Sequence, residues 1–399
     1  MRIITRTILI LSVVSLFADV ASEMLYPVIP VYLKEIGFSM IGIGIMEGFV
    51  NFTAGISKGY FGKLSDEKGL RLPFVKLGYF LSALSKPLIG FFVVPAWIFF
   101  VRTLDRLGKG VRVAAKDALL SAETTKENKA KVFGFNRALD TAGATIGPVV
   151  ALIFLLYYPG QYKTLFLIAF IPGILSVFLI FLLKEKKRPS TTMEKGGFFS
   201  FFKYWKIASG EYRHLVSGLL VFALFNSSDF FLLIKTKETI GESSVQIFGN
   251  KFDSDTITIA AYIVYNLVWA LCSYPLGVLA DKIGFKRIFL AGLILFASVY
   301  AGFAFNPSIP AIFILFGIYG LFSAATDGVS KAWITNIAHD KNTATAVGFY
   351  TSCQSICTLL ASSLAGFIWH QVGSFFTFIS TAIIAFLVFL FLMVKLKNE

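Results

Sequence analysis

The sequence predicts an all-α membrane protein whose twelve transmembrane helices form two six-helix bundles. Three observations support this. Of 399 residues, 56% are hydrophobic and only 15% are charged, which is more apolar surface than a soluble chain of this size can bury. Apolar stretches of about 20 residues, the length that crosses a bilayer, recur along the whole chain. Two short motifs also occur once in each half.

The apolar stretches, taken in chain order, predict six helices in each half. Those of the first half cover 7–33, 40–61, 73–94, 96–120, 130–157 and 163–183. Those of the second half cover 213–236, 256–279, 286–305, 309–336, 342–368 and 373–395. Each stretch is continuous and is separated from the next by a short polar break, as in polytopic helical proteins.

The net charge of +14 reflects the predicted topology and does not indicate a nucleic-acid partner. Lysines and arginines gather in the loops on one side of the predicted membrane and in the long middle loop. The opposite loops carry little beyond Lys34, Lys163, Lys237 and Lys251. Because positive loops stay on the cytoplasmic side, we expect a multi-pass protein of the cytoplasmic (inner) membrane. Both termini should then lie in the cytoplasm.

A polar segment, KEKKRPSTTMEKGG at 184–197, separates the halves. The next residues, FFSFFKYWK, mix aromatics with lysines and suit an amphipathic helix in the membrane interface. The predicted domains are an N-terminal six-helix bundle (1–183), a cytoplasmic linker with this interfacial helix (184–212) and a C-terminal six-helix bundle (213–399).

Two motifs are repeated between the halves. GKLSDEKGLR at 62–71 matches GVLADKIGFKR at 277–287, and AKVFGF at 130–135 matches ATAVGF at 344–349. The offsets between the partners are nearly equal, which indicates duplicated halves. Parallel repeats of this kind build transporters that rock around a site near the membrane midplane.

At these residues the chain resembles the major facilitator superfamily, which carries such a loop after its second helix and again after its eighth. RTLDRLGKGVRVAAKDALL at 102–120 resembles a prokaryotic permease branch with an R-x-x-D-R-x-G-K-G-x-R motif in helix four. The resemblance implies two bundles, a central cavity and alternating access. Carried over, it implies a cytoplasmic gate made by Asp66, Arg71, Asp281 and Lys286. We expect Arg112, at the cytoplasmic end of helix four, to belong to this gate as well.

Charged residues in helix four recur every three or four positions and so form one stripe. Such a stripe cannot face lipid, because each charge there costs several kcal/mol. Arginine and lysine can hold a carboxylate or phosphate. We therefore expect a substrate site built from Arg102, Arg106, Lys86, Arg137 and Lys109.

Carboxylates at similar depth nearly balance these cations, and they are candidates for proton coupling. They are Asp19, Glu23, Glu47, Asp105 and Asp140. Such a carboxylate could take up a proton when substrate occupies its arginine partner. The alternative is that the charges form fixed ion pairs that hold the helices in register.

The sequence therefore predicts a monomeric secondary active transporter that moves a small organic solute, preferably anionic, by proton-coupled alternating access. The alternative is proton-coupled efflux of lipophilic drugs or cations. Catalysis is not expected: GISKG at 55–59 matches a serine-hydrolase pattern but lies in a predicted membrane helix without a His-Asp partner. No motif indicates a cofactor or a metal. Import and export are not distinguished.

Overall fold

The structure is a computed structural model that describes residues 4–26, 28–36, 40–158, 160–185, 197–227, 229–241, 245–247, 250–252, 254–338 and 340–395. Its first bundle comprises α1 (Arg6–Leu25), α2 (Val28–Glu35), α3 (Met40–Lys68), α4 (Leu72–Leu88), α5 (Pro95–Ala122), α6 (Lys129–Tyr157) and α7 (Tyr162–Phe181). Its second bundle comprises α9 (Gly210–Phe225), α10 (Phe230–Ile240), α11 (Ser254–Ile283), α12 (Phe285–Ala304), α13 (Ile309–Ile337), α14 (Thr343–Val372) and α15 (Ser374–Lys395).

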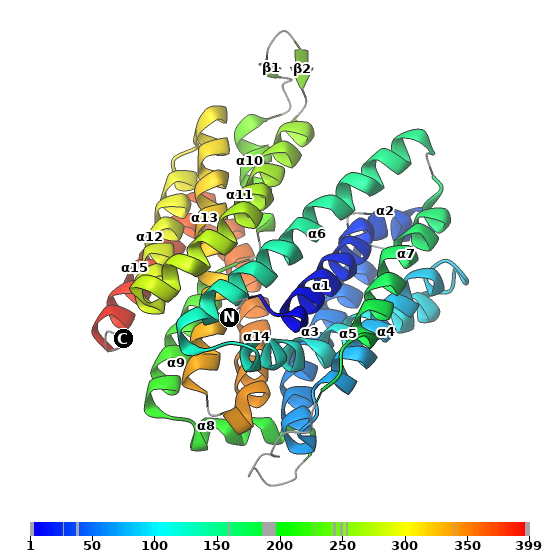
Figure 1. Ribbon diagram of the computed structural model, residues 1–399. Coiled ribbons are helices and arrows are strands. Elements are labelled where there is room, and N and C mark those ends of the chain that lie inside the picture. The colour runs from blue at the N-terminus through cyan, green and yellow to red at the C-terminus, as the bar shows by residue number, and fades with distance from the viewer. Residues whose placement is uncertain are drawn as a thin grey trace.

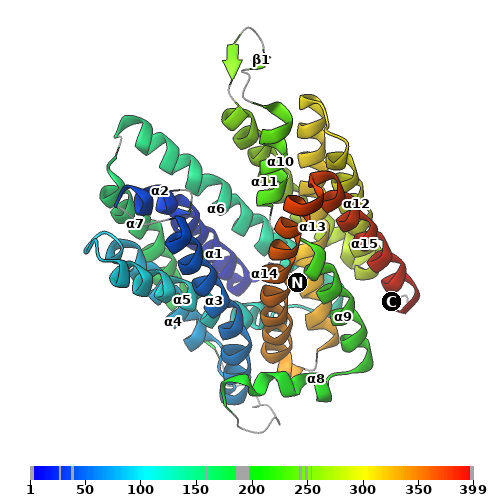
Figure 2. The same cartoon turned by 180° about the vertical axis from the view of Figure 1, so that it is seen from behind.

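Short elements complete the chain. The 3-10 helices are η1 (Lys126–Asn128), η2 (Phe198–Lys203) and η3 (Asp340–Asn342), and α8 (Tyr204–Ile207) follows η2. A small antiparallel hairpin joins β1 (Val245–Ile247) to β2 (Asn250–Phe252). The hairpin and α8 lie at opposite ends of the molecule (Figures 1 and 2). We call the end with α8 the linker end.

The predicted fold of twelve transmembrane helices in two bundles is confirmed. The predicted spans 7–33 and 213–236 are each divided into two helices, α1 with α2 and α9 with α10. The second division runs from Asn226, the C-cap of α9, to Asp229, the N-cap of α10. Asparagine, serine and aspartate compete for helical backbone bonds, which explains why the polar run at 226–229 interrupts an apolar helix.

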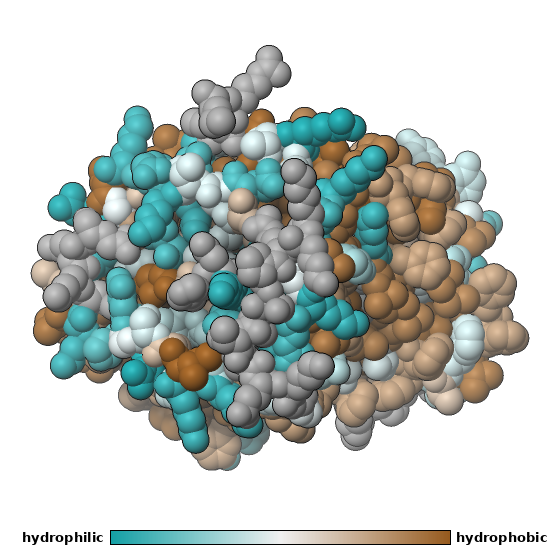
Figure 3. All heavy atoms as spheres, turned by 60° about the horizontal axis from the view of Figure 1, so that its bottom comes forward, coloured by the Kyte–Doolittle hydropathy of each residue, from teal (hydrophilic) through white to brown (hydrophobic). Residues whose placement is uncertain are grey.

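The outer faces of both bundles suit a bilayer. Eight of the described helices are long and apolar enough to cross a membrane. The other spans are shorter, as in α4, or carry many charges, as in α5. Large apolar side chains such as Phe178, Leu271 and Phe367 are exposed on the outside. Hydrophilic residues gather instead over the linker end, beside a broad apolar flank (Figure 3).

Both repeated loops turn at a glycine with a positive φ. Gly69 follows α3 with a φ of 63°, and Gly284 follows α11 with a φ of 97°. Side chains other than glycine rarely adopt these values, so the repeated motif needs glycine at this position. Each turn sends the chain back into the next membrane helix.

The residues after the linker form an aromatic strap, which we define as 198–207. Phe201 is fully buried, and a Cβ on Gly59 of α3 would lie 2.4 Å from its ring. Lys63 of α3 donates a hydrogen bond of 2.7 Å to Ser200. Trp205 stacks on Phe349 of α14 with ring centroids 5.6 Å apart. The strap therefore contacts both bundles; the interfacial helix and the domain boundaries stay predictions.

Candidate functional site

The bundles meet along a seam at the linker end, which we define as the contacts of α3 with α14 and of α6 with α11. Toward the opposite end, α6 and α11 diverge in both views (Figures 1 and 2). Glycines bring the backbones together in the seam. A Cβ on Gly62 would lie 2.4 Å from the Ala344 carbonyl oxygen, and one on Gly277 would lie 2.4 Å from that of Ala130.

The repeated motifs form this seam crosswise. Asp66 of α3 accepts hydrogen bonds from the backbone N–H (2.7 Å) and hydroxyl (2.9 Å) of Thr345 in the first turn of α14. Asp281 of α11 accepts from the backbone N–H groups of Ala130 (2.8 Å) and Lys131 (2.7 Å) in the first turn of α6. Carboxylates stabilise helix N-termini by satisfying free N–H groups and opposing the helix dipole. Each half thus caps a helix of the other.

Of the remaining predicted gate residues, Arg71 contacts a capping aspartate, whereas Lys286 contacts α15 and Arg112 lies within the first bundle. Arg71 forms an ion pair of 3.3 Å with Asp66 and donates to the Ala118 carbonyl oxygen of α5. Lys286 donates to the Met393 carbonyl oxygen near the end of α15. Arg112 lies over the Tyr79 ring at 4.2 Å, inside the first bundle. Asp66 lies beyond the predicted span 40–61, and burial raises its pKa to about 6 against the opposing effects of Arg71 and Thr345.

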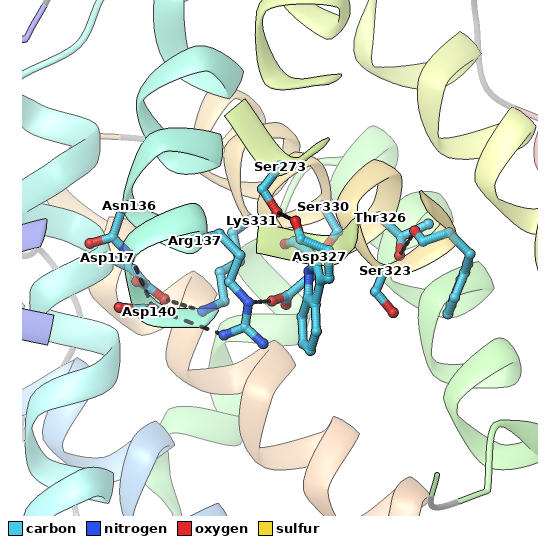
Figure 4. A network of polar contacts seen from close by, with 12 residues as sticks. Asp117, Asn136, Arg137, Asp140, Ser273, Ser323, Thr326, Asp327, Ser330 and Lys331 are labelled. Carbon is cyan, nitrogen blue, oxygen red and sulfur yellow. Dashed lines mark hydrogen bonds and ion pairs between the residues drawn. The ribbon is translucent and has the colours of Figure 1, made fainter. Parts of the chain in front are cut away.

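Above the caps, two ion pairs join the bundles. Arg137 of α6 is 2.5 Å from Asp327 of α13, and Lys331 of α13 is 3.2 Å from Asp117 of α5. Arg137 also lies 3.9 Å from Asp140, so its guanidinium stands between a carboxylate of each bundle (Figure 4). The Asp117 side chain is only 1% exposed.

The sequence reasoning named Arg137 and Asp140 but gave Asp117, Asp327 and Lys331 no site role. The sequence does contain an indication of the pair formed by Asp117 and Lys331. Asp117 and Lys331 are separated by the same interval as Ala130 and Ala344, so they occupy equivalent positions in the two repeats. Residues related by an internal two-fold axis meet across it when they lie close to it.

Two buried lysines of the first bundle, Lys86 of α4 and Lys116 of α5, have carboxylate partners within that bundle. Lys86 forms an ion pair of 2.7 Å with Asp105, which also accepts from Ser82 at 2.6 Å, and both ionic side chains are buried. The neighbouring Lys116 lies 3.5 Å from Asp140 and donates to Ser15 at 2.8 Å. These contacts fit the structural alternative at least as well as a substrate site.

The other predicted residues line the inner side of the first bundle. Arg102 is buried, whereas Arg106, Lys109, Asp19 and Glu23 are partly exposed. The charge of Lys109 interacts with both carboxylates of α1, Asp19 and Glu23. Glu47 belongs to α3, but its side chain lies outside the described part of the structure.

The cavity lies mainly against the second bundle. It has a volume of about 230 Å³ and is lined by α9, the start of α10, α11, α12, α13 and α14, with Arg137 from the first bundle. Seven of its lining side chains are aromatic: Phe222, Tyr265, Trp269, Phe289, Tyr319, Phe322 and Tyr350. Its charged residues are Arg137, Asp229 and Asp327. The sequence analysis gave Asp229 no role in the site.

Other site chemistries find no support in the described residues. No group of three or more His, Cys, Asp or Glu side chains among them is placed to hold a metal ion. Ser57 of the GISKG segment is buried and donates to the Thr53 carbonyl oxygen at 2.6 Å. Its hydroxyl is engaged in its own helix, and the segment packs against α14.

Comparison with known proteins gives consistent matches. The profile of the Major Facilitator Superfamily matches residues 11–250 and 244–399. An uncharacterised MFS-type transporter of Methanocaldococcus jannaschii is 32% identical over 386 residues, covering 96% of this chain and 93% of the relative.

Solved structures resemble the fold at low identity. The human organic anion transporter MFSD10 (TETRAN) matches with a TM-score of 0.74 and 15% identity, covering 97% of this chain and 99% of that one. The transporter FucP in its outward conformation matches with a TM-score of 0.77 and 15% identity, covering 99% of this chain and 100% of that one. At such identities the likeness concerns the fold alone.

Proposed function

Because the chain belongs to the major facilitator superfamily of transporters, we propose that it is a secondary active transporter. It moves a small organic solute across the cytoplasmic membrane by alternating access and couples this movement to protons. The observation that supports the proposal is the position of the contacts that join the two bundles. The two caps and the glycine contacts lie in the seam at the linker end, and one of the two cross-bundle ion pairs, Arg137 with Asp327, lies at the wall of the cavity.

In this proposal the linker end faces the cytoplasm and is closed, while the cavity communicates with the opposite side. The cytoplasmic placement follows from the positive loops of the sequence. Opening requires that α14 leave Asp66, that α6 leave Asp281 and that both ion pairs separate. These hydrogen bonds and ion pairs are few. Binding of substrate and protons can therefore shift the equilibrium between the closed and the open seam, two states that differ by a few kcal/mol.

Arg137 links the two bundles to the proposed proton carriers. With the seam closed, its charge is shared between Asp327 and Asp140. Once the bundles separate, Asp327 moves away, and Asp140 becomes the one carboxylate that Arg137 neutralises. Asp140 also interacts with the negative charge of Asp19, which Lys109 and Arg112 oppose. Proton occupancy of Asp19 and Asp140 would therefore follow the state of the seam.

The solute sign is the open part of this proposal. Arg137 lines the cavity, as the anion prediction requires, but it is already paired. Lys86 is paired too, and Arg102 is buried. The anion prediction, the monomeric state and the direction of transport stay predictions.

The test measures whether the two ends move reciprocally. Spin labels at Lys68 and Lys341 report the linker end across the seam, and labels at Tyr157 and Phe305 report the opposite end; all four side chains are exposed. In nanodiscs, we expect a second population in which the first distance lengthens while the second shortens, with a ratio that changes with pH. Labels at Lys68 and Tyr157, both in the first bundle, provide the control. One fixed distance at both ends, at every pH and with every solute tried, would contradict the proposal.

A further inference from the structure

We infer that Asp229, Tyr265 and Tyr319 form a binding site for the cationic end of an organic monocation. This inference rests on the transport function proposed above and names its substrate class. The cavity of about 230 Å³ is large enough for a charged group with part of its apolar body.

The carboxylate of Asp229 lacks the neutralisation that the other cavity charges have. It accepts hydrogen bonds from the hydroxyls of Tyr319 at 2.6 Å and Tyr265 at 3.4 Å. In the described part of the chain, no lysine, arginine or histidine forms an ion pair with it. A carboxylate held away from bulk water normally has a cationic partner. A bound cation would supply it.

The cavity as a whole has the same bias. Its charged lining residues are Arg137, Asp327 and Asp229, and the first two neutralise each other at 2.5 Å. One negative charge remains when all three are ionised. The Arg137 guanidinium also lies 4.2 Å from the centre of the Trp269 ring. It would repel a second positive charge there, so the site favours a monocation with its charge toward Asp229.

The aromatic rings complete the site. Tyr265 and Tyr319 stack with centroids 4.9 Å apart, Trp269 lies 5.4 Å from Tyr265, and Phe322 lies 5.4 Å from Tyr319. All four line the cavity. Aromatic faces attract organic cations through the ring quadrupole, and the attraction strengthens away from water. An inorganic anion would gain nothing from these rings.

The interrupted helix adds a second acceptor. Asn226 ends α9 and Asp229 begins α10, and both line the cavity. The Asn226 Oδ1 is buried and receives no hydrogen bond from the described residues. An ammonium group has donors for both oxygens, Asn226 Oδ1 and the Asp229 carboxylate. Interrupted transmembrane helices commonly mark ligand sites in transporters, because they bring unpaired polar groups to the midplane.

The experiment compares three solutes of similar shape: 2-phenylethylammonium, neutral 2-phenylethanol and anionic 3-phenylpropionate. Binding to the purified full chain in detergent is measured by thermal shift and calorimetric titration, because a ligand of the folded state raises the melting temperature. We expect the ammonium to bind at least about tenfold more tightly than the other two, since charge-assisted bonds add this much.

Three variants locate the site. Asp229→Asn should weaken ammonium binding about tenfold or more, and Tyr319→Ala should weaken it through loss of the ring. Tyr319→Phe keeps the ring and should stay within about threefold. Glu238→Gln is the matched control, because Glu238 is an exposed carboxylate of α10, the helix whose N-cap is Asp229. Melting temperatures without ligand show that each variant is folded.

The outcomes separate this inference from the proposed function. Equal binding of the anion, or unchanged ammonium binding in both Asp229→Asn and Tyr319→Ala, overturns the cation site. If reciprocal movement of the spin labels persists in that case, transport stands without it. If ammonium binding follows the prediction while the label distances stay fixed, the cation site stands and alternating access falls.

Discussion

The two walls that face each other across the molecular centre carry different chemistry. The wall of the first bundle is charged, and its buried ions are largely paired with each other, as in Lys86 with Asp105 and Lys116 with Asp140. The wall of the second bundle is aromatic and carries Asp229, whose described partners are tyrosine hydroxyls. The duplicated halves have therefore diverged. The charges in the wall of the first bundle are paired with each other, whereas the wall of the second bundle has a carboxylate that a bound ligand could neutralise.

The largest expected effect is a difference in stability between variants of the two walls. Lys86→Met removes the cation that pairs with the buried Asp105, leaving it only the weaker influence of Arg106 and Arg102, and should lower the free energy of unfolding by about 3–5 kcal/mol. The double change Lys86→Met/Asp105→Leu should restore most of it, since the ion pair is then removed as a whole. Asp229→Asn in the other wall should change stability by less than about 1 kcal/mol, because no cation loses its partner. Melting in detergent checks all three, and equal losses in both walls would break the comparison.

The second effect concerns the pairs that cross between the walls. Lys331→Ala removes the partner of Asp117 and should favour opening of the seam by about 2–3 kcal/mol, less than a fully buried pair because Lys331 is 21% exposed. Hydrogen exchange at the capped amides of Ala130, Lys131 and Thr345 measures this opening. Lys331→Ala combined with Asp117→Asn should return exchange toward the parent rate. Unchanged exchange in Lys331→Ala would show that this pair does not hold the seam.

The third effect comes from the close backbone contacts. Gly62→Ala places a methyl group 2.4 Å from the Ala344 carbonyl oxygen, and overpacking of this kind costs about 1–3 kcal/mol. We expect the label distance between Lys68 and Lys341 to shift toward the open population. Gly210→Ala, where nothing lies within 4 Å, is the control. A closed population as large as in the parent would mean that the seam accommodates the methyl group.

The smallest effect is the response of the seam to pH. The pKa of Asp66 is about 6 in the closed seam, above the ordinary value of 3.8 that exposure would restore. The closed seam then binds this proton more tightly. Its stabilisation is complete below about pH 4 and is lost as pH rises through 6, by at most about 1.4 kcal/mol per pH unit.

The same spin-label pair therefore should show more closed population at pH 5 than at pH 7. Asp66→Asn removes the titrating group and should flatten this part of the profile. An identical profile in the variant would assign the response to other groups.

The sequence predicted the helices and the duplication well, because hydrophobic length and repeated glycine turns are local properties. It also named the residues of both caps, since Asp66 and Asp281 stand in the repeated loops. It could not predict that each aspartate caps a helix of the opposite half, because that depends on how the halves dock. For the same reason the sequence could not show which residue pairs with each charge of 102–120. Asp105 of α5 meets Lys86 only because α4 packs on α5.

The site on the second bundle was harder to foresee for a different reason. Aromatic residues in a membrane helix are equally consistent with lipid contact, packing or a cavity wall. Tyr265 and Tyr319 are 54 positions apart in the chain, and the structure places their rings 4.9 Å from each other. The local signal was the polar run at 226–229, which interrupts an otherwise apolar stretch. Glu47, which the sequence named as a proton carrier, lies outside the described side chains.

The aromatic strap bears on whether the two halves need to be one polypeptide. Phe201 is anchored against Gly59 and Trp205 against Phe349, so the strap grips both bundles without relying on the peptide chain that leads into it. A protein made as two fragments, divided ahead of Gly197, would keep the strap on the second fragment. The second fragment would then carry the segment that binds the first fragment. The covalent linker would matter more for equal amounts and assembly of the two halves than for the stability of their contact.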